Sequence, residues 1–291
     1  MRVARGGAGF IVTLAAFCLI PAICMTPAVA ADGAGREASP PDDPPDAPMT
    51  WGQVGRDARY FYTRPAHLDR AGWTKVAWTL GIGASLYLVR DEVRDWSQSH
   101  RTESRDDFLQ TIRNMGKGAS VPVVALGFYL AGKATHSARR RETAVVLLES
   151  VTYALTVQVV GSYVLASERP DEGDDIDFFR TGGHGVSGDV TIAASLLAPI
   201  IDRHLRVQSD DSRAVRFWKH FGTWGLYGAA GLVAHQRINQ DKHYIPDVFL
   251  GYATGLTAGR LVVDSRRGGR EWRDAQRVRV IASAGGLRIV W

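Results

Sequence analysis

Cysteine is almost absent from this sequence, which has two cysteines, Cys18 and Cys24, in 291 residues. Both lie in the first thirty residues, so a chain that loses this segment has no thiol. That excludes a disulfide framework, a thiolate metal site and a cysteine nucleophile. Lysine is scarce too: 30 of the 35 cationic residues are arginine, whose forked donors suit bidentate recognition of oxyanions. The net charge of +5 is modest and the basic residues are scattered, which argues against a nucleic-acid partner.

Residues 1–30 have the pattern of an export signal. Arg2 and Arg5 give a positive start, Phe10 to Met25 is apolar, and small residues at 28–30 precede Ala31. We therefore expect an exported, periplasmic protein. A first membrane anchor is the alternative interpretation, which would make the chain an integral inner-membrane protein.

The next segment, 31–50, is rich in proline and aspartate and cannot bury enough apolar surface to fold, so it is predicted to be an unstructured linker. We expect the helical domain to cover 51–270. The tail, 271–291, alternates apolar and polar residues around Gly285-Gly286, which predicts a small β-hairpin.

Beyond the linker, apolar segments with helix-compatible spacing are separated by charged or glycine-containing turns. Six such segments in sequence predict an all-α fold, a helical bundle of about six core helices. We expect the stretch 90–117 to be a charge-rich loop between the first two. The six segments are Lys75–Val89, Ala119–Ala131, Thr143–Ser167, Val186–Ile201, Phe217–Ala234 and Tyr244–Val263.

Long uninterrupted hydrophobic runs are also missing. Most of these segments offer about 12–16 apolar residues, fewer than the roughly 20 that cross a bilayer, and the longest carries Glu149. The most basic loops, 133–141 and 203–219, would also face outward if the chain had six spans after a cleaved signal, against the usual tendency. This favours a bundle that is soluble or associated with a membrane surface over an integral one.

Three polar clusters lie at the ends of the predicted helices. "SERPDEGDDID" (167–177) follows the third helix, "GGHGVSGDVTIAAS" (182–195) leads into the fourth, and "HQRINQDKHYIPDVFLGYATG" (235–255) joins the fifth to the sixth. In a bundle of alternating direction these helix ends lie at one end of the molecule, so we expect the three clusters to converge.

The residues that would converge suit an oxyanion. Arg169 and Arg237 supply fixed positive charge, and Ser187 and Gly188 offer a hydroxyl and backbone N–H groups at a helix N-terminus. His243 is the nearby nucleophile or base, with Asp247 about one helical turn further on to orient its ring. Each has a simpler structural interpretation as well: Arg169-Pro170 can be a helix stop, and Ser187 a helix cap.

Glycines at 251, 255 and 259 recur every four residues on the sixth predicted helix. Four-residue spacing places them on one face, where the missing side chains allow a neighbouring helix to approach closely.

The order Arg-Pro, then Ser-Gly at a helix start, then Arg, five residues, His, three residues and Asp resembles the type 2 phosphatidic acid phosphatase and vanadium haloperoxidase superfamily. "RINQDKHYIPDVFLG" (237–251) is the most similar stretch. The resemblance implies a helical bundle that hydrolyses phosphomonoesters or diphosphates, often lipidic, with no metal or other cofactor. It implies that His243 attacks phosphorus and forms a phosphohistidine, that Asp247 orients it, and that the phosphate-binding residues are Arg169, Ser187, Gly188 and Arg237.

The sequence departs from the family pattern at three positions. Ser162 stands where the first motif has a lysine, and Gln236 stands where the third has a serine. Asp189 replaces the histidine that protonates the leaving oxygen. Asp189 can do so only if its surroundings keep it protonated, and His184, five residues upstream, is the other candidate for a catalytic acid.

The sequence therefore predicts an exported phosphatase acting on a phosphomonoester or a lipid phosphate or diphosphate. The expected partners are this substrate and a membrane surface. The alternative is a catalytically impaired relative that binds phosphate without turnover, as the missing lysine and Asp189 suggest. A vanadate-dependent haloperoxidase is the third hypothesis, and it is disfavoured because that chemistry depends on the same cations.

Overall fold

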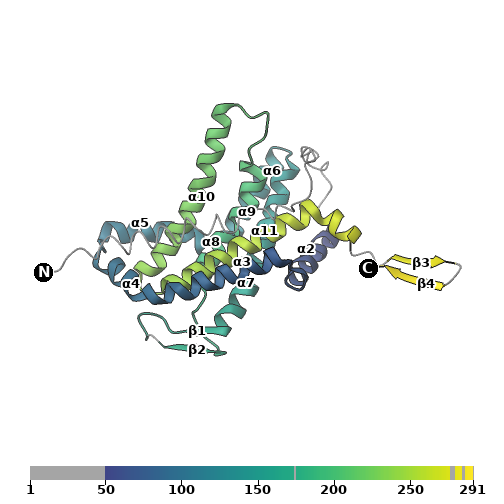
Figure 1. Cartoon of the computed structure of the whole chain (residues 1–291). Helices are drawn as coiled ribbons and strands as arrows, with labels where there is room; N and C mark the ends of the chain where they lie inside the picture. Colours follow the sequence, from purple (N-terminus) through teal and green to yellow (C-terminus); the bar gives the residue numbers. More distant parts are fainter. Residues whose placement is uncertain (1–49, 174, 276–278, 284–285, 291) are drawn as a thin grey trace.

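The computed structural model describes residues 50–173, 175–275, 279–283 and 286–290. The expected export signal and nearly all of the expected linker lie outside the described residues. Within the described part the chain is helical, with two short antiparallel strand pairs, so the predicted all-α class is confirmed. Figure 1 shows the order of the elements along the chain.

The α-helices vary from one turn to more than eight. They are α2 (Trp51–Thr63), α3 (Arg70–Leu86), α4 (Arg90–Ser99), α5 (Glu103–Arg113), α6 (Ser120–Ala134), α7 (Ala138–Val164), α8 (Gly188–Ser195), α9 (Leu197–Ile200), α10 (Arg213–Asn239) and α11 (Ile245–Ala275). Short tighter or wider turns join some of them: the 3₁₀ turns η1 (Arg64–His67), η2 (Tyr87–Val89) and η3 (Asn114–Gly116), and the π turn η4 (Ile201–Leu205).

Two strand pairs complete the fold. Strands β1 (Leu165–Ser167) and β2 (Ile176–Phe178) pair antiparallel with Ala166 opposite Asp177, directly after α7. Strands β3 (Arg279–Ser283) and β4 (Gly286–Val290) pair antiparallel as well, which is the hairpin predicted for the C-terminal tail. The first pair was not predicted, because three-residue strands leave almost no periodic pattern in a sequence.

Polar caps start most of the helices where the sequence offers them. The side chain of the residue before the helix accepts a backbone N–H from the first turn in five cases, which satisfies one of the donors that a helix start leaves unpaired. These N-cap residues are Thr50 (α2), Asp69 (α3), Thr102 (α5), Ser137 (α7) and Ser212 (α10).

Each of the six predicted apolar segments lies in a helix, with ends shifted by a few residues and with the fourth divided between α8, α9 and η4. The expectation of a loop at 90–117 is wrong, because α4, α5 and η3 occupy most of it. These two helices carry many charges and bury only a narrow stripe, including Val93 and Leu109. A narrow stripe is a weak signal against so many charged neighbours.

The core lies where α8 packs between α10 and α11. Val190, Val233, Ile245 and Val248 are fully buried there. The glycines of α11 allow α8 to approach it closely. A Cβ placed at Gly251 would lie 2.6 Å from the Ser187 carbonyl oxygen, and a Cβ at Gly259 would lie 2.6 Å from the Ser195 carbonyl oxygen. Gly255 meets the Thr191 carbonyl still more closely. The expected close-packing face of this helix is therefore present, and its neighbour is α8.

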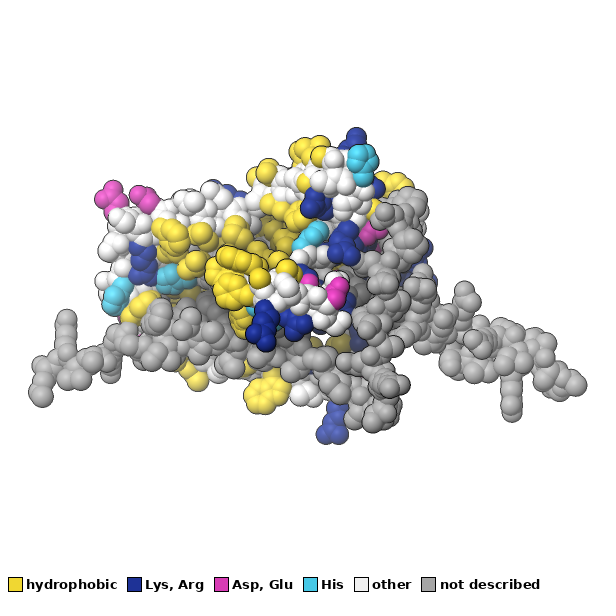
Figure 2. Space-filling view, turned by 90° about the horizontal axis from the view of Figure 1, so that it is seen from above, with side chains coloured by type: hydrophobic (Ala, Val, Ile, Leu, Met, Phe, Trp, Pro, Cys, Tyr) yellow, Lys and Arg dark blue, Asp and Glu magenta, His cyan; other side chains and the backbone are white. Residues whose placement is uncertain are grey.

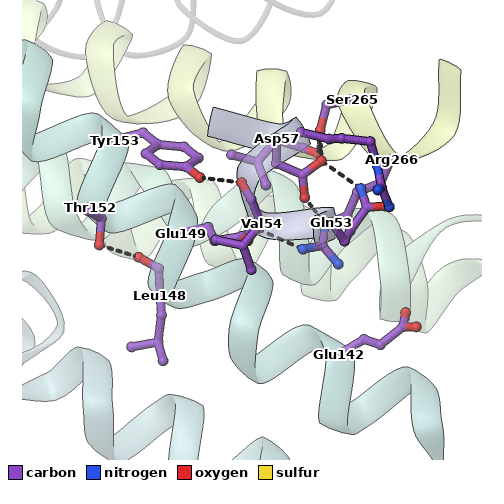
Figure 3. Close-up of polar contacts among 12 residues, drawn as sticks. Gln53, Val54, Asp57, Glu142, Leu148, Glu149, Thr152, Tyr153, Ser265 and Arg266 are labelled. Atoms are coloured by element: carbon purple, nitrogen blue, oxygen red, sulfur yellow. Dashed lines mark hydrogen bonds and ion pairs between the residues drawn. The ribbon is translucent and has the colours of Figure 1, made fainter. Parts of the chain in front are cut away.

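A buried polar cluster ties α2 to α7 and α11. Figure 3 shows Arg266 and Ser265 of α11 beside Asp57 of α2 and Glu149 of α7. Arg266 lies 2.9 Å from one Asp57 oxygen and donates over 2.7 Å to Glu149, while Ser265 donates over 2.7 Å to Asp57. Glu149 therefore faces an arginine inside the bundle, and its charge is no obstacle to an apolar environment on the outer side of α7.

The surface is unusually apolar on several helices. Large hydrophobic side chains are exposed on α3, α6, α7 and α10, and Figure 2 shows hydrophobic side chains gathered across the middle of the face seen from above. The N-terminal half of α10 stands out from the other helices and exposes Phe217, Trp218, Phe221 and Trp224 (Figure 1). Among the described helices, α7 is long and apolar enough to cross a membrane by length and composition. Exposed apolar patches of this kind mark contact with a partner or a membrane.

The glycine face of α11 predicts the effect of an added methyl group. Gly255→Ala is expected to lower the free energy of unfolding by about 1–3 kcal/mol, because the new Cβ would overlap the Thr191 carbonyl and neither backbone can withdraw. Thermal unfolding of the purified chain measures this change.

Gly225→Ala on α10 is the matched control, because a Cβ there meets nothing within 4 Å. It is expected to be neutral or to stabilise by up to about 1 kcal/mol through helix propensity. Equal melting temperatures for the two variants would contradict the close contact between α8 and α11.

Candidate active site

The three polar clusters converge at one end of the bundle. The Ser187 N–H donates to the Asp247 carbonyl over 3.1 Å, which joins the second cluster to the third. Lys242 of the third cluster pairs with Asp171 of the first, and the His184 ring lies 6.3 Å, centre to centre, from the His243 ring. The sequence-based expectation about helix ends therefore holds for the described residues.

The end of α7 holds the glycine-rich turn in place. The Ser162 hydroxyl and the Gln158 amide both donate to the Val186 carbonyl, over 3.1 and 3.0 Å. On the other side, the His184 N–H donates to the Ser167 carbonyl of β1 over 2.9 Å. Gly185 lies against the Leu165 carbonyl, where no side chain would fit. Ser162, which stands where the family that the sequence resembles has a lysine, thus supports the turn and supplies no charge.

Ser187 occupies the N-cap position of α8, but its side chain makes no capping hydrogen bond. Its hydroxyl is fully buried and has no partner among the described residues. The interpretation of Ser187 as a simple helix cap is therefore not supported. Gly188 begins α8, so its N–H is one of the donors at the start of the helix that no preceding turn satisfies.

His243 lies just before α11, and Asp247 lies in its first turn. The His243 Nδ1 is 3.6 Å from an Asp247 oxygen, longer than a hydrogen bond and within ion-pair range. That oxygen accepts the Tyr244 N–H over 3.0 Å, so Asp247 also caps the helix start. Both side chains are more than 90% buried. Asp247 is thus fixed by the backbone and faces Nδ1 of the imidazole.

Arg237, at the end of α10, and Arg169, after β1, bring the expected positive charge. Arg237 is nine-tenths buried, and burial lowers the pKa of its guanidinium from the usual value. Arg169 is more exposed and donates to Glu172 over 3.1 Å. Helix α7 ends at Val164, five residues earlier, so Arg169-Pro170 is not the helix stop that the sequence allows as an alternative.

Asp189 faces two guanidiniums. The Arg113 Nε donates to its Oδ2 over 2.9 Å, and a terminal nitrogen of Arg237 lies 3.4 Å from the same oxygen. Sequence reasoning missed Arg113, which lies at the end of α5 inside the stretch expected to be a loop. The buried Leu109 and the half-buried Ile112, three residues apart, are the helical pattern that would have revealed it.

His184 lies in the glycine-rich turn and is partly buried. Its pKa is lowered from the usual value by burial first, and then by the charges of Arg169 and His243. The imidazole is therefore neutral at pH 7, since even its unperturbed value lies near 6.5.

Arg94 of α4 is a second residue that sequence reasoning missed. It donates twice to Asp241, over 2.6 Å each, and once to the Pro170 carbonyl over 3.0 Å. The hydrogen bond with Asp241 raises its pKa further above the usual value. Asp241 has a positive φ of 56° in the turn before His243. Arg94 therefore joins the Arg-Pro loop to the turn that carries the histidine.

Tyr87 is a third such residue. Burial and the charge of Asp247 raise its pKa to about 12, and its hydroxyl is buried with no partner among the described residues. The hydroxyl is thus protonated at all physiological pH values.

Several buried polar atoms of the site have no hydrogen-bond partner within the described part of the chain. Buried polar groups in folded proteins are nearly always satisfied, so a cluster of unpaired ones marks a place where a polar ligand binds. The described residues contain no group of three or more histidines, cysteines or acidic residues arranged to hold a metal ion. The unpaired atoms are the Ser187 hydroxyl, Nε of Arg169 and of Arg237, Nδ1 of His243 and Oδ1 of Asp247.

No protein-family model matches this chain, and no curated protein matches it. Among solved structures, LpxE from Aquifex aeolicus is similar with a TM-score of 0.46 and 16% identity, over 60% of this chain and 95% of that one. A transmembrane PAP2-type phosphatidylglycerolphosphate phosphatase from Bacillus subtilis is similar with a TM-score of 0.45 and 13% identity, over 79% of this chain and all of that one. The chemistry of the site in this chain follows from its own residues.

The Arg94 contacts predict a measurable loss of stability. Arg94→Ala is expected to lower the free energy of unfolding by about 2 kcal/mol, because it removes a half-buried bidentate pair and leaves Asp241 without its cation. Lys242→Ala removes a more exposed pair in the same turn and is expected to cost less than about 1 kcal/mol. Urea unfolding of both variants makes the comparison, and an equal loss would contradict the anchoring role of Arg94.

Proposed function

We propose that the chain is a member of the type 2 phosphatidic acid phosphatase and vanadium haloperoxidase superfamily, and that it hydrolyses a phosphate ester or anhydride without a metal ion. The observation that carries this proposal is the buried His243, whose Nδ1 faces Asp247, together with the buried donors of Arg237, Arg169 and Ser187 that also have no hydrogen-bond partner among the described residues. A histidine held by a carboxylate in a cluster of anion-binding groups is an arrangement for nucleophilic attack on phosphorus.

His243 is the proposed nucleophile. The Asp247 carboxylate accepts the N–H at Nδ1 of the imidazole. It stabilises the positive charge that the ring acquires when its other nitrogen bonds to phosphorus. The 3.6 Å separation is long, and such hydrogen bonds commonly tighten only when substrate is bound. The backbone contact at Tyr244 keeps the carboxylate in place in the meantime.

The phosphoryl oxygens are proposed to bind Arg169, Arg237, the Ser187 hydroxyl and the Gly188 N–H. The N-terminus of α8 adds its partial positive charge. Burial of Arg237 disfavours its charged form, and an anion bound beside the guanidinium counteracts this effect, so the two favour each other. Donors fixed before the reaction stabilise the charge that develops in a phosphoryl transfer.

The substrate is proposed to be a lipid phosphate or diphosphate, and the protein to be associated with a membrane. Exposed aromatic and aliphatic side chains on α3, α6, α7 and α10 support this, since an aqueous surface does not favour so many of them. The site lies at the end of the bundle where α7 and α10 finish, and the exposed side chains of the last turns of α7, Val157, Val159, Val160 and Tyr163, lie toward the same end. A substrate with an apolar tail can place the tail along them and its headgroup in the site.

The nucleophile can be tested with p-nitrophenyl phosphate, phosphatidic acid and an isoprenyl diphosphate as substrates of the purified chain. His243→Ala is expected to lower kcat by on the order of 10³ or more, because the covalent step is lost. His220→Ala, an exposed histidine on α10, is the matched control and should leave turnover at the wild-type level. A rapid quench with labelled substrate should trap an acid-labile phosphoryl group on the wild type and not on His243→Ala.

Two outcomes would contradict this proposal. Turnover by His243→Ala at the wild-type rate would exclude the histidine as nucleophile. Binding of phosphate or vanadate without turnover of any of the three substrates would favour the alternative, a relative that keeps the bundle and the anion site but has lost catalysis.

The membrane association has its own test. We expect the chain to remain in the membrane fraction in 1 M salt, which screens electrostatic attachment, and to be released by detergent. Trp218→Glu combined with Phe221→Glu should weaken retention, whereas His220→Glu adds a charge on the same helix without removing an apolar side chain. Recovery of the wild type in the soluble fraction at low salt would contradict the proposal.

A further inference from the structure

Asp189, at the start of α8, is paired with Arg113 at the end of α5. Gly116 lies against the Asp189 carbonyl, so η3 packs directly on the first turn of α8 and holds Arg113 beside the carboxylate. Arg237 approaches the same carboxylate oxygen from α10. Asp189 is thus held between cations from two helices, and about three quarters of its side chain is buried.

A carboxyl group can donate a proton only when it carries one. The Asp189 carboxylate accepts a hydrogen bond from Arg113 and lies at ion-pair distance from Arg237, so in this arrangement it is the acceptor and counter-ion of two cations and not a proton donor. His184, the other candidate for a catalytic acid, is neutral at pH 7 because burial and the Arg169 charge lower its pKa. Asp189 is therefore engaged as an acceptor by both arginines, and His184 is not an imidazolium that could protonate the leaving group at neutral pH.

Phosphate compounds differ in how much they need that proton. A phosphomonoester of an alcohol expels an alkoxide, a strong base, and general acid catalysis of such a step is worth about 10²–10⁴ in rate. A phosphoanhydride expels a phosphate group, whose second pKa of about 6 makes it a weak base that leaves unprotonated at neutral pH. What the departing phosphate needs is positive charge nearby.

We propose that this site cleaves phosphoanhydrides in preference to phosphomonoesters, and that Arg113 receives the departing phosphate. The proposal rests on the phosphatase function inferred above. Arg113 uses Nε for Asp189, and a guanidinium has five N–H donors, so the residue can bind both partners. Arg113 also brings to the site a cation from α5, in a chain where Ser162 replaces the lysine that the family pattern has on α7.

Hydrolysis of the anhydride balances in atoms and electrons without a proton donor for the leaving group. The free imidazole nitrogen of His243 attacks the terminal phosphorus, the bond from phosphorus to the bridging oxygen breaks, and its electron pair leaves with the lipid monophosphate. Water then attacks the phosphohistidine, the P–N bond breaks, and its electron pair returns to the imidazole. The released phosphate carries both protons of the water until it exchanges them with solvent.

Matched pairs of substrates test this selectivity with the full chain in detergent at pH 7. Geranyl diphosphate is compared with geranyl monophosphate, and diacylglycerol pyrophosphate with phosphatidic acid, so that the tail is constant within each pair. The expected kcat/KM is at least about 100-fold higher for the anhydride in both pairs, and the monophosphate should accumulate as product.

Two variants separate the two parts of the proposal. Asp189→His places a group that can be protonated near neutral pH at the same position, and it should raise the rate on the monophosphates and narrow the ratio at least about tenfold. Arg113→Gln should lower kcat/KM for the anhydrides by on the order of 10², as loss of a transition-state donor does. Arg101→Gln removes an exposed cation next to α5 and should leave the ratio unchanged.

These measurements distinguish a failure of the selectivity from a failure of the phosphatase function. Similar rates within each pair, abolished by His243→Ala, would overturn the selectivity and leave the histidine phosphatase intact. Cleavage of the monophosphates alone would also overturn it. No hydrolysis of any of the four compounds by the wild type would overturn both proposals, even if Asp189→His restored activity, since an anhydride should not need that acid.

Discussion

The close approach of α8 to α11 is the contact on which the rest of the structure depends. Gly251 allows the Ser187 backbone to lie against α11, and the Ser187 N–H donates to the Asp247 carbonyl at the same place. One contact therefore sets both the packing of the core and the distance between the anion-binding turn and the histidine pair. A side chain at any of the three glycines would separate the helices and the site together, because interiors are too densely packed to absorb the added volume.

Around this contact the charges are arranged in pairs that come from different helices. Arg94 joins α4 to the turn before His243, Arg113 joins α5 to Asp189, and Arg266 joins α11 to two carboxylates far from the site. Charges this deeply placed need such partners, since an unpaired one would cost several kcal/mol. Buried polar atoms without a partner occur elsewhere in the described residues too, but those of Arg169, Arg237, Ser187, His243 and Asp247 all belong to the three clusters that meet at the end of the bundle.

Much of this could be read from residue patterns. The six apolar segments, the C-terminal hairpin and the glycine face of α11 all follow from periodicity, which local spacing determines. The convergence of the three clusters follows from helix direction alone. Helices α4 and α5 could not be read in the same way, because their buried stripes are narrow and their many charges resemble those of a loop. Arg94 and Arg113 were missed for that reason.

The sequence by itself determined the helical class and predicted which residues form the candidate site, Asp189 among them, because both depend on residue type and spacing along the chain. Only the tertiary structure decided what surrounds Asp189. Its two guanidiniums come from positions 76 residues before it and 48 after it, and no local pattern links them. The packing of helices from distant parts of the chain sets which groups lie within a few ångströms of a carboxylate, and the spacing of residues along the sequence does not.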